Sequence, residues 1–206
     1  MTVTKPATEL PRSDRIALRV LAGIAVALAA ATFVIGGYQL MATLSGGETP
    51  VELLTRAEVP HTNKGQPLLV SAGFTNASVI ASGLTDGTRA LLATGLGLGL
   101  LTAIVVSCAI AYLFVSVSRG RPFARLHYRV TLLTGATLAF GALLAQFVGG
   151  LGQMGAAEEL NPTANDVFEV AFTFDPILPI AGFAVLALAY VFRAGARLQR
   201  DTEGLV

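Results

Sequence analysis

The sequence has few charged residues and only one cysteine. Charged residues make up 13% of the 206 positions, about half of the ~25% typical of soluble domains. That scarcity argues against a soluble globular enzyme, and a formal net charge of +1 provides no basic field to attract nucleic acid. The lone Cys108 excludes an intrachain disulfide and a cysteine-clustered metal site. What is abundant is apolar: 53% hydrophobic residues and 22 glycines predict an integral membrane protein.

Four apolar runs are long enough to cross a bilayer, which requires a helix of ~20 residues. They cover residues 20–44, 90–117, 130–154 and 176–196. We therefore expect an all-α membrane protein, a four-transmembrane-helix bundle. A cleaved signal peptide is the alternative for the first run, because a basic leader precedes it. The run is too long for that, since the apolar region of a signal peptide has ~7–15 residues.

The charges predict an orientation. Eleven of the fourteen Lys and Arg lie in the N-terminus at 1–19, the loop at 118–129 and the end of the last helix with its tail at 197–206. Lys and Arg are enriched in cytoplasmic loops, so both termini and this loop are expected in the cytoplasm. With four acids, this side carries +7. The loops at 45–89 and 155–175 carry three cations and nine acids, so the extracytoplasmic side carries −6.

The two extracytoplasmic loops predict a small cap with short strands. Strand-like runs at 51–59, 67–72 and 77–81 are separated by turn-forming residues. A lone hairpin is marginally stable in water, so the sheet needs the second loop, the helix ends or a partner as cover. In the second loop, Asn161-Pro162 and the apolar spacing that follows favour either a short interfacial helix or an irregular loop. Asp175 is either the N-cap of the last helix or a functional carboxylate.

Two stretches carry a family resemblance. Arg119-Gly-Arg-Pro-Phe123 lies between the second and third spans, and the last span runs into Tyr190-Val-Phe-Arg-Ala-Gly-Ala-Arg-Leu-Gln-Arg-Asp-Thr-Glu-Gly-Leu-Val206. The chain resembles, over about residues 85–206, the bacterial membrane family known as domain of unknown function 2975. The resemblance implies four spans and a role in regulation, sensing or immunity to membrane-active peptides. It implies no catalytic residue, because the family defines none.

No motif points to an enzyme or a cofactor. The sequence has no Gly-x-Ser-x-Gly elbow and no histidine–carboxylate cluster with metal-ligand spacing. The glycines at 95, 97 and 99 follow no strand, so they are not a dinucleotide loop. We therefore expect no catalytic residue, no metal and no cofactor.

The spans instead carry rows of small residues, which let membrane helices approach closely. These rows pack either the chain's own helices or a partner subunit: Gly23, Ala27 and Ala31; Gly95 and Gly99; Gly141 and Ala145. A candidate polar crevice comprises Gln39, Gln146, Gln153 and Asp175. Candidate contacts for anionic lipid headgroups or an acidic partner on the cytoplasmic side are Arg119, Arg121, Arg125, Arg129, Arg193, Arg197 and Arg200.

Three functions remain open. The first is a non-catalytic interaction, sensing or peptide-immunity module, whose acidic outer face attracts a cationic peptide or a membrane protein. The second is an accessory subunit of a larger membrane complex. The third is a carrier of a small molecule or lipid that uses the polar crevice. A transporter coupled to ions is disfavoured, because no span has a charge near its centre.

Overall fold

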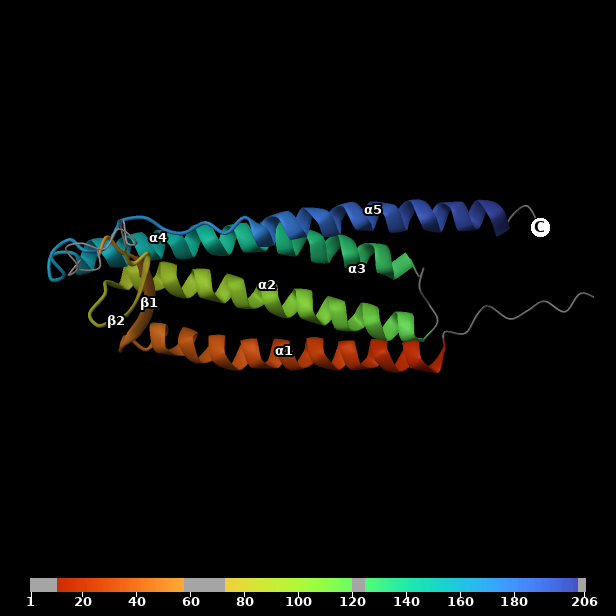
Figure 1. The fold of residues 1–206 in the computed structure, drawn as a ribbon, viewed down its shortest axis with the longest axis horizontal. Coiled ribbons are helices and arrows are strands. Elements are labelled where there is room, and N and C mark those ends of the chain that lie inside the picture. The colour runs from red at the N-terminus through yellow and green to blue at the C-terminus, as the bar shows by residue number, and fades with distance from the viewer. Residues whose placement is uncertain (1–10, 58–72, 120–124, 204–206) are drawn as a thin grey trace, which may run out of the picture. The chain divides into compact units, whose positions relative to one another are not determined.

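Four long apolar helices account for most of the chain. A computed structural model describes residues 11–57, 73–119 and 125–203 (Figure 1). The helices are α1 (Arg12–Leu44), α2 (Asp86–Ser118), a third formed by α3 (Arg125–Ala136), η1 (Thr137–Gly141) and α4 (Ala142–Leu160), and α5 (Ile177–Glu203). Each has a stretch long and apolar enough to cross a membrane, so the chain is a multi-pass membrane protein.

A two-stranded antiparallel hairpin lies between α1 and α2. It consists of β1 (Thr49–Leu54) and β2 (Asn76–Ala81), with Thr49 opposite Ala81 and Leu54 opposite Asn76. The prediction of four membrane helices with a small cap containing strands is thereby confirmed. The expected run at 67–72 lies outside the described residues. The first three helices are longer than their uncharged runs, because their charged ends at Arg12, Asp86 and Glu159 are also helical.

The chain divides into two compact units, which we describe separately. The span unit comprises Met1–Ile35, Leu100–Leu143 and Pro176–Val206. The hairpin unit comprises Gly36–Gly99 and Leu144–Asp175, and therefore contains β1, β2 and the segment between α4 and α5.

Small residues bring the helices of the span unit together. Ala139 of η1 and Ala189 of α5 are fully buried. A Cβ atom added to Gly182 would collide with the backbone of Ala139, and one added to Gly135 would lie 2.7 Å from the backbone nitrogen of Leu186. Without a hydrophobic effect between helices in lipid, such backbone contact supplies dispersion energy that larger side chains would prevent. The π-helical turn η1 lies at this contact, and no sequence pattern predicted it.

The inner face of the hairpin is the core of the hairpin unit. Along β1, Val51 and Leu53 are buried whereas Pro50 and Glu52 are exposed, which is the alternation of a one-sided sheet. The buried side chains pack with Ala81, with Leu84 and Leu92 at the start of α2, and with Ala156 and Ala157 near the end of α4; Phe168 joins from the second loop. Both the helix ends and the second loop thus cover the sheet, as its marginal stability requires.

The segment after α4 is not the interfacial helix that we considered. It forms turns from Asn161 to Asp166 and then an extended stretch, in which Phe168 makes an isolated antiparallel bridge to Thr55. Asn165 and Asp166 have φ angles of 52° and 54°, in the left-handed region that a right-handed helix cannot contain. The alternative prediction, an irregular loop, describes this segment. Figure 1 shows it returning along α4.

Candidate functional site on the hairpin unit

The hairpin unit carries an excess of acidic side chains. Its described residues include eight acids and two arginines, a net charge of −6. Both arginines are already paired: Arg56 Nε lies 3.1 Å from Glu169 Oε1, and Arg89 pairs with Asp86. Among the described residues, no salt bridge compensates four exposed acids, namely Glu48, Glu52, Glu158 and Asp166. The unit therefore presents a net negative field to any charged partner.

One acid, Glu159, has a structural task. Its Oε2 accepts the backbone N–H of Thr85 at 2.8 Å, and its Oε1 accepts the hydroxyls of Thr85 and Thr88, each at 2.6 Å. Thr85 is the N-cap of α2, and its hydroxyl accepts the backbone N–H of Thr88 at 3.4 Å. In a capping box, the acid that binds the N-cap N–H comes from the same helix, three residues on. Here it comes from the last turn of α4.

Glycines set the distance between these two helices. A Cβ atom on Gly95 would collide with Gly149, one on Gly152 would lie 2.7 Å from Leu92 N, and one on Gly155 would lie 2.8 Å from the hydroxyl of Thr88. Successive turns of α4 thus contact successive turns of α2 at backbone distance. This close approach continues to Glu159, and it explains why the short threonine side chains can reach its carboxylate.

Two side-chain amides hold the extended segment. Asn161 donates Nδ2–H to the carbonyl of Phe168 at 2.9 Å and accepts that residue's N–H at 3.0 Å. Gln146 does the same for Asp175, with bonds of 3.0 and 2.7 Å. Each amide replaces the neighbouring strand that an extended backbone would otherwise need. This matters in a membrane protein, because unsatisfied backbone groups are expensive in lipid.

Aromatic rings fill the space between α4 and this segment. The ring of Phe172 lies over Gly150, where a Cβ atom would overlap it, and it meets Phe147 edge-on at a centroid distance of 6.0 Å. Phe174 also lies 6.0 Å from Phe147. The segment is therefore fixed along α4 by ring packing as well as by hydrogen bonds.

Of the four residues expected in a polar crevice, hydrogen bonds join two. Gln146 contacts the backbone of Asp175. Gln39 is exposed on α1, and Gln153 is half-buried on α4, two turns from Gln146. The choice between N-cap and functional carboxylate for Asp175 stays open, since these two bonds involve only its backbone; α5 begins two residues later, with Ile180 N–H donating to Pro176 O at 3.0 Å.

The small-residue rows differ in their surroundings. Gly95 lies against Gly149, and a Cβ atom on Gly99 would be 4.0 Å from the Cβ of Ala145, while one on Gly141 would be 2.5 Å from the hydroxyl of Thr102. By contrast, Gly23, Ala27 and Ala31 are exposed, and a Cβ atom on Gly23 meets nothing within 4 Å. The buried positions on this part of α1 include Ala22, which is 6% exposed. This row on α1 is therefore exposed, and the structure does not show it in helix packing.

The structure describes only some of the arginines expected to contact lipid headgroups or a partner. Arg119 and Arg129 are exposed, and Arg193 lies over the ring of Tyr128 at 5.6 Å in a cation–π contact. Arg121 and the side chains of Arg125, Arg197 and Arg200 lie outside the described part of the chain. The lipid or partner contact assigned to this set stays a prediction.

The described residues of the hairpin unit thus give this membrane protein an acidic surface. No known protein family, curated protein or solved structure matches the chain. Among the described residues, no three His, Cys, Asp or Glu side chains are grouped to hold a metal ion.

Sequence reasoning found the excess of acids but missed the most highly connected one. In the sequence Glu159 is indistinguishable from its neighbour Glu158, whereas in the structure Glu158 is exposed and Glu159 accepts three hydrogen bonds. The sequence signal for this contact is Thr85, the N-cap residue before Asp86, because no Glu or Gln follows it three residues later to complete a capping box. The carboxylate that completes the cap comes from another helix instead.

Proposed function

We propose that this protein is a non-catalytic membrane module that binds cationic peptides at the acidic surface of its hairpin unit, in a sensing or immunity role. The uncompensated charge is the observation that supports it. Both described arginines of the unit are engaged in salt bridges, while four exposed acids have no such partner among the described residues.

The proposal includes an orientation in the bacterial cytoplasmic membrane. The cation-rich termini and the loop at 118–129 lie in the cytoplasm, and the hairpin unit faces outward, as the distribution of Lys and Arg favours. In this orientation the exposed Arg119 and Arg129 meet anionic headgroups. The resemblance to the domain of unknown function 2975 family is part of the same proposal, and it assigns no residue a role.

Peptide binding to the purified protein in lipid nanodiscs tests the proposal. A short peptide in which lysine and valine alternate should bind, and its affinity should fall as salt rises, because exposed charges are screened. A peptide with glutamate in place of lysine is the matched control and should not bind. Equal binding of both peptides, or none of either, would contradict the proposal. Empty nanodiscs of the same zwitterionic lipid measure the background.

The two other functions lack an observation of this strength. The carrier hypothesis needs four polar residues in one crevice, and the hydrogen bonds described above support this for Gln146 and the backbone of Asp175. The accessory-subunit hypothesis would use the exposed row that includes Gly23 on α1, but small residues alone do not identify a partner.

A further inference from the structure

The outer edge of β2 is free of any strand in the described part of the chain. Thr55 donates its N–H to Thr75 O across the hairpin at 3.1 Å, so these opposite residues form a hydrogen-bonded pair. This pair determines which residues of each strand bond to the partner strand. In an antiparallel pair, every second residue points its N–H and C=O away from the partner strand. With the observed register, these residues on β2 are Asn76, Ser78 and Ile80.

The opposite edge of the hairpin, on β1, shows the same alternation, and its outward backbone groups are already hydrogen-bonded. On β1, the alternate residues direct their backbone outward: Leu54 O accepts the N–H of Glu169 at 2.9 Å, and Arg56 N–H donates to Val167 O at 2.9 Å. Farther along the same edge stands Pro50, which has no N–H to offer. The β1 edge is therefore covered at one end and blocked at the other.

The β2 edge lacks the features by which proteins protect such edges. Natural edge strands carry charged residues, proline or a bulge that prevents pairing with another chain. The six residues of β2, Asn-Ala-Ser-Val-Ile-Ala, include no charge, proline or glycine, and they pair with β1 without a bulge. Ile80 is 68% exposed. The strand thus offers an unprotected template for an added strand.

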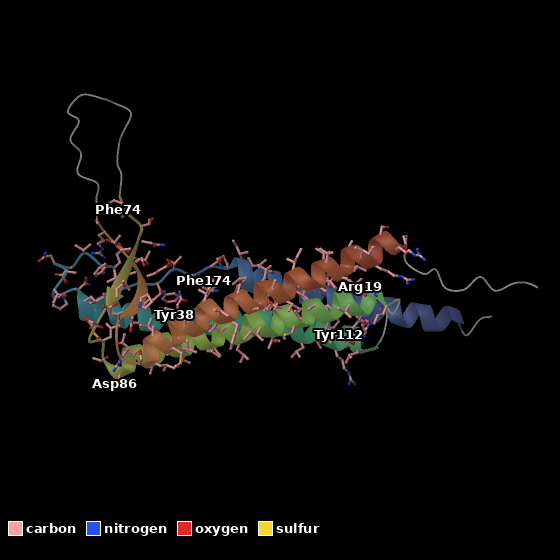
Figure 2. The ribbon with its side chains drawn as sticks, turned by 90° about the horizontal axis from the view of Figure 1, so that it is seen from below. Arg19, Tyr38, Phe74, Asp86, Tyr112 and Phe174 are labelled. Atoms are coloured by element: carbon pink, nitrogen blue, oxygen red, sulfur yellow. The ribbon has the colours of Figure 1, made fainter. Side chains whose placement is uncertain are left out.

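The charges near this edge indicate which kind of chain would bind there. Glu52 stands directly opposite Ser78 on the exposed face. Glu48 precedes β1 at the end where Ala81 terminates β2. Figure 2 shows β2 between Phe74 at one end of the hairpin and Asp86 at the other. A second copy of the chain would bring another hairpin unit, whose described residues carry the same net charge of −6, to this edge, whereas a cationic chain is attracted.

We propose that the free edge of β2 binds an extended cationic peptide by strand addition, with Asn76, Ser78 and Ile80 supplying the backbone hydrogen bonds. This inference rests on the proposed function and locates its binding site. Main-chain bonds give affinity in this mode, and alternate side chains give specificity. Since the exposed face carries Glu52 and the inner face apolar residues, the preferred peptide alternates basic and apolar side chains.

The test separates backbone pairing from charge attraction. The lysine–valine peptide is compared with a version that is N-methylated at every second amide, along the edge that would pair with β2. Methylation keeps every charge of the peptide but removes the N–H groups that would donate to β2. On the protein, Ser78→Pro removes one outward N–H while leaving the bonds to β1 intact. Glu52→Gln is the matched variant that removes charge and keeps the edge. Circular dichroism and melting temperature establish that the variants fold.

We expect about tenfold or more weaker binding for the methylated peptide, since several hydrogen bonds are lost, and about three- to tenfold weaker binding for Ser78→Pro, since one is lost. For Glu52→Gln we expect a salt-dependent loss that disappears at high salt. If the unmodified peptide binds but methylation and Ser78→Pro change nothing, strand addition is wrong while charge attraction stands. If no cationic peptide binds, the proposed function fails with it. If Ser78→Pro instead converts a dimer into a monomer at unchanged peptide affinity, the edge belongs to a second copy and the inference is overturned.

Discussion

Glu159, in the last turn of α4, accepts the backbone N–H of Thr85 at 2.8 Å and thereby caps the N-terminus of α2. The N-cap of one membrane helix is completed by the C-terminal turn of another. A sequence change in either helix end therefore alters both.

Replacing Glu159 should destabilise the protein more than replacing its neighbour. Glu159→Ala removes the acceptor for three hydrogen bonds, and we expect a loss of about 2 kcal/mol in the free energy of unfolding. Glu158→Ala removes the same charge from an exposed position and should change it by less than about 0.5 kcal/mol. Thermal unfolding in detergent measures both. Equal effects would show that only charge matters.

Two glycines of α2, two residues apart, should respond in opposite ways to alanine. A Cβ atom at Gly95 would collide with Gly149, whereas one at Gly97 meets nothing within 4 Å. We expect Gly95→Ala to destabilise the protein by about 1–3 kcal/mol through overpacking. Gly97→Ala should be neutral or stabilising by about 0.5–1 kcal/mol, because alanine restricts the unfolded chain. A tolerated Gly95→Ala with a damaging Gly97→Ala would place the opposite face of α2 against α4.

Gln146 should control the order of the extended segment. Gln146→Leu removes both bonds to the backbone of Asp175, and each is worth about 1 kcal/mol. We expect faster hydrogen–deuterium exchange in residues 170–175 in this variant. Gln153→Leu, on the same helix, is the control and should leave that exchange unchanged. Identical exchange in both variants would mean that the phenylalanine cluster alone fixes the segment.

Releasing an acid from its salt bridge should strengthen peptide binding. Arg56 pairs with Glu169 at a largely exposed site, where the two side chains are 71% and 39% exposed, so Arg56→Gln should cost less than about 1 kcal/mol of stability. It adds an uncompensated acid to the hairpin unit, and we expect the cationic peptide to bind about two- to fivefold more tightly at low salt. Arg119→Gln lies outside this unit and should have no effect. Unchanged affinity for Arg56→Gln would indicate that charge does not guide binding.

The orientation can be tested by labelling single cysteines in intact cells. In a Cys108→Ala background, Asp166→Cys should react with a membrane-impermeant maleimide, because that exposed position is expected outside the cell. Arg119→Cys, also exposed, should react only after the membrane is permeabilised. The reverse pattern would invert the topology and place the acidic surface in the cytoplasm.

The sequence predicted those parts of the architecture that depend on one property, such as the length of an uncharged run. Runs without charge have a length that only membrane helices explain, so the four spans followed directly. The apolar and β-branched runs at 51–59 and 77–81, bounded by turn-forming residues, likewise indicated short strands, and the structure has β1 and β2 there. The segment after α4 was harder, because Asn161-Pro162 is a helix-start signal locally, while the structure uses the Asn161 side chain to bind Phe168 seven residues later.

The candidate site was predictable in its charge and not in its contacts. Counting acids between the spans identified an excess, since composition is independent of conformation. Which acid is engaged depends on the pairing of helices: Glu159 meets Thr85 from 74 residues away. The π-helical turn η1 likewise lies where Gly182 of α5 approaches Ala139, a contact between distant parts of the sequence.

The bridge between Thr55 and Phe168 has a consequence for biosynthesis. A ribosome makes β1 and β2 well before it makes Phe168, and three of the four spans precede that residue. The inner face of the hairpin, which Leu84, Leu92, Ala156 and Ala157 can already contact, therefore lacks its cover from Phe168 until most of the chain has been synthesised. During this interval we expect β2 to be prone to pairing with a wrong strand. Truncations that end before Phe168 should accordingly be cleared by membrane proteases.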